Sequence, residues 1–148
     1  MNVSQGDLAQ FASLLQALRS PDNSARSAAE ATYKAAQKAD PNAVLYSLTA
    51  SMGPACEDVQ RTQAATLLRR AIVGPGETPW GQASAATHAH VQRAYFQCLE
   101  QETLPAVRKI IVAGITVAAR NATAEAPWPE LVSNAFALAA SAQTRHQE

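Results

Sequence analysis

The side chains in this sequence best suited to chemistry are two histidines and two cysteines, His88, His90, Cys56 and Cys98. Histidine nitrogens and cysteine thiolates are the usual ligands of zinc, and two ligands share a helix face at a spacing of three or four residues. His88 and His90 are two residues apart, so on a helix they point to different sides. The other ligands that a metal needs do not lie near them, and we expect no metal site.

The sequence offers no catalytic arrangement either. Cys98 and His88 lie ten residues apart, too far along one helix for a nucleophile and its base. Gly74-Pro75-Gly76 is rich in glycine, but no Lys-Ser or Lys-Thr pair follows it, so it is not a phosphate-binding loop. Glu100 and Glu102 do not share a helix face, and the motif G-x-S-x-G is absent. We expect neither an enzyme nor a bound cofactor.

Composition narrows the class of protein. The 148 residues carry 12 basic and 12 acidic side chains, a balance that argues against a general nucleic-acid-binding or membrane-surface protein. Hydrophobic residues, rich in alanine, make up 47% of the chain, which favours closely packed helices. No apolar run approaches the ~20 residues of a membrane span, and the first residues lack the features of a signal peptide. For the two cysteines, buried reduced thiols are favoured over a disulfide.

Apolar residues recur at helical spacing along most of the chain. The clearest stretch is residues 57–73, where one face carries Ala64, Leu68, Ala71 and Ile72. Acidic residues in its first turn and arginines in its last turn suit the helix dipole. Short breaks that contain proline, glycine or aspartate separate this stretch from similar ones, which favours helices that pair as antiparallel neighbours.

The expected helices group into repeated pairs. Units are predicted over about residues 7–39, 42–73 and 82–121, and a helix over 128–142 starts a fourth unit. The units start 35 to 46 residues apart, which fits HEAT or armadillo repeats, while the tetratricopeptide signature is absent. The predicted fold is all-α, an α-solenoid of HEAT-type hairpins with about three pairs and one further helix. Because each solenoid unit must be covered by the next, we expect residues 1–148 to be one amino-terminal domain of a longer chain.

Five positions have specific structural expectations. Asp7 is a candidate N-cap of the first helix, and Val59 is expected to widen the apolar face of the central helix. Arg61 falls on that same face, so its stem should be packed and its charged head paired. Val112 belongs to a helix that is apolar nearly all round, which indicates cover on more than one side. Gly114 in that helix is expected to allow a neighbouring helix to approach closely.

Charged residues gather on the polar sides of the second, fourth and sixth expected helices. They are Arg26, Glu30 and Lys34; Arg61, Arg69 and Arg70, of which Arg61 is the special case that falls on the apolar face; and Arg108 and Lys109. Exposed charges are the norm, and a simple solvated face is favoured for any one of these residues. In a solenoid, however, the second helices of successive pairs line one concave surface that binds extended partners. The charged sides are therefore either solvent-exposed surface or a binding surface.

Three segments have a more specific character: SPDNSARSAAEATYKAA, RTQAATLLRRAIV and VRKIIVAGITVAARNATAEAPWPEL. In order and spacing they resemble the opening of importin-β-type nuclear transport receptors (β-karyopherins), closest to the branch that includes importin five. AATLLRR and the VRKI and WPEL series are the strongest pieces. The resemblance covers roughly residues 11–139. Residues 74–87 do not align, and family members are several times longer than this chain.

The resemblance implies HEAT repeats, passage through nuclear pores between cytoplasm and nucleus, and binding of the GTP form of the small GTPase Ran near the amino end. It also implies that cargo proteins and phenylalanine-glycine nucleoporins bind mainly to parts beyond this chain. The Ran contacts that it suggests are Arg26, Glu30, Arg69, Arg70 and Arg108. The alternative is a general HEAT-repeat scaffold with no GTPase partner. A nucleotide-dependent interaction with Ran separates the two.

Overall fold

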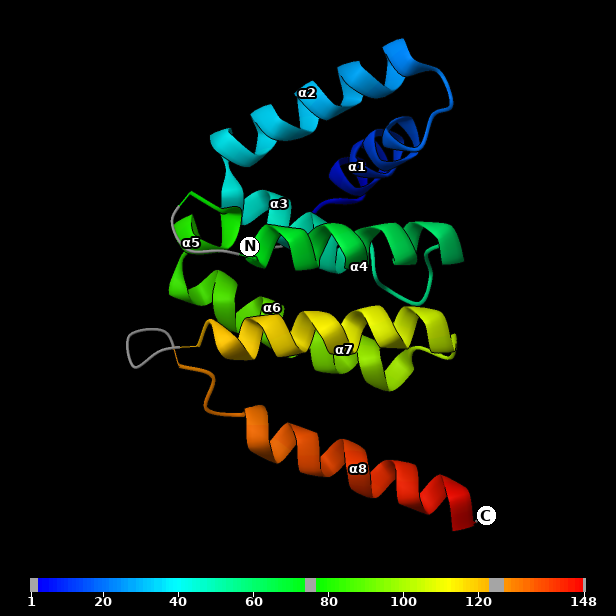
Figure 1. Cartoon of the computed structure of the whole chain (residues 1–148), viewed down its shortest axis with the longest axis vertical. Helices are drawn as coiled ribbons and strands as arrows, with labels where there is room; N and C mark the ends of the chain where they lie inside the picture. The colour runs from blue at the N-terminus through cyan, green and yellow to red at the C-terminus, as the bar shows by residue number, and fades with distance from the viewer. Residues whose placement is uncertain (1–2, 74–76, 123–126, 148) are drawn as a thin grey trace.

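The structure is a computed structural model that describes residues 3–73, 77–122 and 127–147, with side chains as far as residue 140. Every regular element in these ranges is a helix, so the predicted all-α class is confirmed (Figure 1). The helices are α1 (Gln5–Leu18), α2 (Asn23–Ala39), α3 (Pro41–Ala50), α4 (Asp58–Ile72), α5 (Pro79–Gln82), α6 (Ala85–Gln101), α7 (Pro105–Arg120) and α8 (Leu131–Gln147).

Short polar side chains define where the first three helices begin. Ser4, and not Asp7, caps α1: its Oγ accepts a hydrogen bond from Asp7 N at 3.1 Å and donates to the Asp7 carboxylate at 2.6 Å. The expectation for Asp7 is wrong because this residue takes the third helical position and supports the cap from there. Asp22 and Asp40 cap α2 and α3, and Pro41 takes the first position of α3, where a helix loses no hydrogen bond.

The long helices pack in pairs along the chain. α1 packs against α2, α3 against α4, and α6 against α7. In Figure 1, α2, α4 and α7 all run from the right of the view to the left. α4 and α7 lie side by side, whereas α2 diverges from α4 toward the α1–α2 turn and packs on α1 and α3. The second helix of the first pair therefore stands apart from α4 at its amino end.

α4 is the centre of the core. Its buried residues include Ala64, Ala65, Leu68 and Ile72, and α1, α3, α5 and α7 cover this face. Val59 is 48% exposed and does not widen the buried face as expected. It precedes Leu68 by nine residues, about two and a half helical turns, so its side chain points to the opposite side of α4.

α7 packs against two helices, so the expected cover on more than one side is confirmed, but the helix is not covered all round. Val107, Ile111 and Ala118 are buried where α7 meets α4 and α6, but Val112 is 49% exposed. Val112 remains in solvent because α8, the next helix along the chain, does not pack along α7. The broad apolar surface of this helix thus exceeds what its described neighbours bury.

Gly114 lies where α7 meets the ring of Tyr95 on α6. A methyl carbon added at Gly114 would lie 2.7 Å from Tyr95 Cζ. Tyr95 is fully buried, so its ring has no route toward solvent. The close approach expected at this glycine is confirmed, and the neighbour is an aromatic ring of the paired helix.

We expect Gly114→Ala to lower the free energy of unfolding by about 1–2 kcal/mol. Overpacking typically costs ~1–3 kcal/mol and outweighs a gain of up to ~1 kcal/mol in helix propensity. Urea unfolding followed by circular dichroism measures the difference. Adding Tyr95→Phe should relieve part of the cost, because the Tyr95 hydroxyl is the group nearest to the added methyl. A stabilising effect of Gly114→Ala would mean that helix propensity dominates and that the ring yields.

The connection between α4 and α6 contains the short helix α5, which the sequence predicts only as a loop. Trp80 of α5 is buried, and α5 packs against α3 and α4. Asn42 ties the start of α6 to α3, because its Oδ1 accepts hydrogen bonds from Ser84 N at 2.9 Å and from Thr87 Oγ1 at 2.7 Å. Residues 74–76, the expected glycine-rich stop of the central helix, lie outside the described residues.

α8 leaves an apolar side uncovered. It continues to Gln147, beyond the expected end of the 128–142 helix. The preceding Trp128 is buried and meets Phe96 of α6 edge-on, with 5.5 Å between the ring centroids. Further along, Phe136 is 73% exposed. The described chain therefore anchors the entrance to α8, packs Leu131 and Leu138 against the core, and leaves Val132 and Phe136 in solvent.

Candidate functional site

A groove of about 710 Å³ runs between α2 and α4, and we call it the α2–α4 groove. Its walls include Glu30, Tyr33, Lys34 and Gln37 from α2 and Leu67 and Arg70 from α4. The groove exists because α2 diverges from α4. The corresponding second helix of the third pair, α7, packs closely on α4 instead (Figure 1). It is therefore a consequence of how the first pair sits on the second.

The carboxyl end of α1 separates the two walls. Leu18 lines the groove from this side. Gln63 of α4 fixes the end of α1, because its Nε2 donates to Leu15 O at 2.9 Å and its Oε1 accepts a hydrogen bond from Arg19. Since α1 packs on both α2 and α4, this contact holds the groove open in a defined shape.

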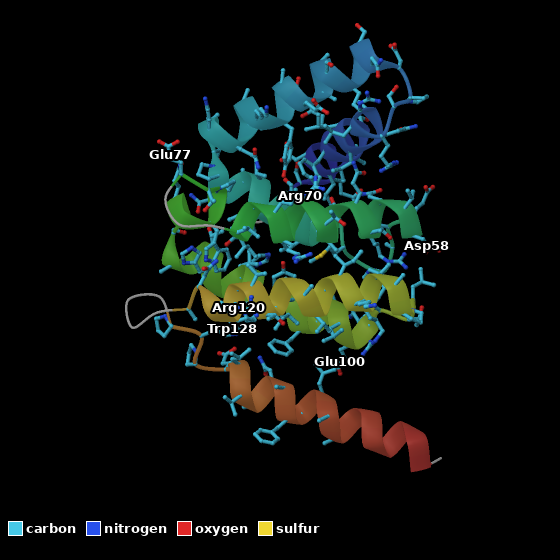
Figure 2. All side chains as sticks on the ribbon, viewed as in Figure 1. Asp58, Arg70, Glu77, Glu100, Arg120 and Trp128 are labelled. Atoms are coloured by element: carbon cyan, nitrogen blue, oxygen red, sulfur yellow. The ribbon has the colours of Figure 1, made fainter. Side chains whose placement is uncertain are left out.

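The charged side chains of the groove have no partners among the described residues. Glu30, Lys34 and Arg70 are exposed, and the ion pairs of the described chain are both made by Arg61. Figure 2 places Arg70 on the edge of α4 that faces α2. Glu30 and Lys34 lie one helical turn apart on the facing side of α2. The groove thus presents one negative and two positive charges to a ligand.

Tyr33 adds a buried donor to this surface. It is only 8% exposed, and its hydroxyl has no hydrogen-bond partner within the described structure. Burial raises the pKa of Tyr33 to about 12, and the nearby side chains of Gln37 and Arg70 act in the opposite direction. The hydroxyl therefore remains protonated at neutral pH. In the sequence, Tyr33 lies on the apolar face of its helix, which predicts a core residue. The one feature that indicates a place at the edge of that face is the adjacent charged residue, Lys34.

The residues implied by the resemblance do not gather in one place. Glu30 and Arg70 line the same groove. Arg69 is exposed on α4 but lies outside the groove, and its charge acts on the buried hydroxyl of Tyr95 on α6. Burial raises the pKa of that tyrosine above its ordinary value, and Arg69 opposes the shift. The adjacent residues Arg69 and Arg70 therefore lie on different sides of α4, Arg70 toward α2 and Arg69 toward Tyr95.

Arg26 and Arg108 are engaged in local structure. Arg26 Nη1 donates to Ser20 O at 3.2 Å, which fixes the α1–α2 turn. Arg108 Nη1 donates to Leu99 O and, at 2.9 Å, to Glu102 O, which fixes the end of α6. Each arginine thus lies near the start of a second helix and hydrogen-bonds to the segment just before it.

The same position is repeated in all three pairs. Arginine is the fourth residue of α2, α4 and α7, where it is Arg26, Arg61 and Arg108. Arg61 Nη1 donates to Cys56 O at 2.7 Å, so each of the three closes the connection within its own pair. One local device therefore recurs in three successive helix pairs.

Arg61 differs from the other two because it also joins two pairs. Its Nε and Nη2 donate to the Glu102 carboxylate at 2.8 and 3.0 Å, and both residues are buried. Glu102 Oε1 also accepts from Leu104 N at 3.1 Å, near the start of α7. The hydrogen bond from Arg61 holds the pKa of Glu102 below its ordinary value, and burial opposes it. The expected paired head of Arg61 is confirmed, with a partner that the sequence did not identify.

The remaining candidate residues have local structural roles. His88 Nε2 lies 2.7 Å from Trp80 O, and His90 Nε2 lies 3.2 Å from Thr49 Oγ1. Within the described ranges, histidine, cysteine and acidic side chains form no group of three that could hold a metal ion. Both cysteines are free thiols, with Cys98 buried and Cys56 only half-buried.

No helix in the described part of the chain is both long and apolar enough to cross a membrane.

We compared the chain with known proteins. No protein family, no curated protein and no solved structure matches it.

Proposed function

We propose that this chain is the amino-terminal part of a nuclear transport receptor of the importin-β type, an α-solenoid of HEAT-type pairs that binds the GTP form of Ran. In this proposal the protein moves between cytoplasm and nucleus. Cargo proteins and phenylalanine-glycine nucleoporins bind mainly to parts beyond residues 1–148. The chain acts as a binding protein with no catalytic site, cofactor, nucleic acid or membrane partner.

The observation that supports the proposal best is the arrangement of the second helices. α2, α4 and α7 run in one direction, each opening with the same structural arginine, and exposed charges point from α2 and α4 into a shared groove. Repeated pairs with this arrangement suit an extended protein partner. The three segments that resemble the importin-β family supply the identity of that partner.

A general HEAT-repeat scaffold is the second candidate, and the same helix arrangement suits it. The two differ in one measurable property. Ran orders its switch segments around GTP and releases them in the GDP form, so a Ran receptor distinguishes the two forms. A general scaffold has no reason to do so.

Titration of this chain with Ran loaded with GTP or GDP tests the proposal. We expect tighter binding of the GTP form. Arg69→Glu together with Arg70→Glu should weaken that binding by at least about tenfold, ~1.4 kcal/mol. Both side chains are exposed and make no hydrogen bond or ion pair with other described residues, so the fold should persist. Calorimetry gives the affinities, and circular dichroism checks the helix content.

Arg93→Glu is the control, because it makes one such charge reversal at an exposed position on α6, a first helix. It should leave the affinity for Ran within about twofold, or ~0.4 kcal/mol. Equal affinity for the two nucleotide forms would favour the general scaffold. A nucleotide preference that the double reversal leaves intact would retain the function and remove Arg69 and Arg70 from the contact surface.

A further inference from the structure

The hydroxyl of Tyr33 in the α2–α4 groove lacks a hydrogen bond that a ligand could supply. It is a buried group that makes no hydrogen bond of normal length and angle with the described residues, although the Gln37 side chain lies beside it, and folded proteins almost always satisfy such groups. Its surroundings are the groove walls, with Gln37 and Arg70 close enough to affect its ionisation. A ligand group that enters here and accepts a hydrogen bond would remove this deficit.

Two flexible side chains lie beside the hydroxyl. The oxygen itself exposes less than 1 Å², so a ligand cannot reach it while the present cover remains. The long side chains beside it belong to Gln37, which is half-buried, and Arg70, which is exposed. Rotation of either side chain on the surface is fast compared with binding. The donor is therefore available to a ligand that displaces its cover.

Charge selects the kind of acceptor. Lys34 and Arg70 bring two positive charges to the groove, and Glu30, one helical turn before Tyr33, brings one negative charge. A carboxylate can pair with Arg70 through charge-assisted hydrogen bonds while it accepts from a hydroxyl. The balance of two positive charges and one negative charge favours an anion, and the apolar part of the groove decides which kind.

The apolar part of the groove indicates what stands next to the carboxylate. Leu18 and Leu67 line the same space from α1 and α4. In an extended segment, the side chains two residues before and after an acidic residue point to the same face as it does, about 6.6 Å away along the chain, so apolar residues at those positions would lie against Leu18 and Leu67. A free small acid would leave this surface uncovered.

We propose that the α2–α4 groove binds an acidic side chain of a partner protein, flanked by apolar residues in an extended segment. The partner's carboxylate replaces the cover of Tyr33, accepts from its hydroxyl and pairs with Arg70. The inference rests on the proposed function only for the identity of the partner. If the partner is Ran, the groove is one place where it contacts this chain. The chemistry of the groove itself does not depend on Ran.

Blocked pentapeptides test this without Ran. The probe is Leu-Ala-Glu-Ala-Leu, and the matched peptides have glutamine or lysine at the centre. Titration into the isotope-labelled 148-residue chain, followed by NMR, should shift the amide signals of α2 and α4 around Tyr33 and Arg70. We expect the glutamate peptide to bind about five- to tenfold more tightly than the glutamine peptide, and the lysine peptide not to saturate.

Three variants assign the preference to the groove. Tyr33→Phe removes the unpartnered hydroxyl and should weaken binding of the glutamate peptide about threefold or more. Arg70→Gln should abolish the preference for glutamate over glutamine. Arg93→Gln on α6 should change neither quantity. Tyr33→Phe removes no hydrogen bond with a described residue, so its fold should persist, and its amide spectrum verifies this.

Several results would overturn the inference: equal binding of the glutamate and glutamine peptides, shifts confined to other helices, or variants at Tyr33 and Arg70 that match the wild type. Inorganic phosphate that shifts the same signals with equal affinity would indicate a general anion site and would also overturn it. The outcome is separate from the Ran titration. Peptide selectivity without a nucleotide preference retains the groove and rejects the transport role, and the reverse result retains the role and rejects the groove.

Discussion

Glu102→Ala is expected to lower the free energy of unfolding by about 3–5 kcal/mol, the usual cost of removing one partner from a buried ion pair. The change leaves the Arg61 guanidinium buried without its main partner. It also removes the acceptor for Leu104 N near the start of α7. Urea unfolding at about pH 7, followed by circular dichroism and by tryptophan fluorescence, measures the loss and tests whether one transition describes both signals.

Asp58→Ala is the matched control for this prediction. Asp58 also pairs with Arg61, with 3.0 Å between its Oδ1 and Nη2 of the arginine, but its side chain is 73% exposed. An exposed pair contributes little, so the change should stay within about 0.5 kcal/mol. Similar losses for Asp58→Ala and Glu102→Ala would show that burial of the Arg61–Glu102 pair adds nothing to its role.

A double variant separates the pair from its surroundings. Arg61→Met with Glu102→Leu replaces both charges by apolar side chains of comparable size. It should cost less than the sum of the two single changes, because no buried charge remains unpaired. Additive losses would mean that each residue acts through other contacts, such as the hydrogen bond from Arg61 to Cys56 O.

The pair also makes stability depend on pH. The pKa of Glu102 is lower in the folded chain than its ordinary value of 4.5. As the pH falls, the unfolded chain therefore takes up this proton first, and the folded state loses stability. The contribution is fully present above the ordinary value and disappears as the pH falls through the folded-state pKa. Wild-type protein should lose stability more steeply below about pH 5 than Glu102→Gln does.

The helices could be predicted from the sequence because their signals are local. Apolar spacing located the seven long helices, and Asp22 and Pro41 mark two of their starts. The short helix α5 was missed because four residues do not complete a period of apolar spacing. Val59 was misassigned because it is apolar and lies near the start of the apolar face, although nine residues place it opposite Leu68 on the helix. Direct comparison of helical angles would have placed it correctly.

The site was harder to predict because its contacts connect residues that are distant in the sequence. Glu102 pairs with Arg61 across 41 positions, and no local pattern indicates that partner. The α2–α4 groove depends on the angle of α2, which the packing of α1 sets and periodicity does not. The repeated arginine could have been predicted from the sequence. Once the helix starts are known, the fourth residue of each second helix is an arginine: Arg26, Arg61 and Arg108. Their shared register would have indicated a structural role.

Leu68→Ala is the other change with a large expected effect. Leu68 is fully buried at the centre of α4, the helix that contacts α1, α3, α5 and α7. Its removal leaves a cavity between at least two helix pairs, which typically costs ~2–5 kcal/mol. In the α-solenoid that we propose, the loss at such an interface also weakens the coupling between neighbouring units. We therefore expect a lower midpoint in urea and a broader transition.

Val59→Ala in the same helix is the control for Leu68→Ala. Its side chain is 48% exposed, so the lost contact is small and the gain in helix propensity partly offsets it, for a net change within about 0.5 kcal/mol. Both variants shorten an apolar side chain of α4 to alanine. The main difference between the two positions is that Leu68 is buried and Val59 is exposed. A loss at Leu68 no larger than that at Val59 would place Leu68 on the surface and contradict the position of α4 at the centre of the core. A large loss with an unchanged slope against urea would keep Leu68 in the core and show that the pairs unfold as one unit.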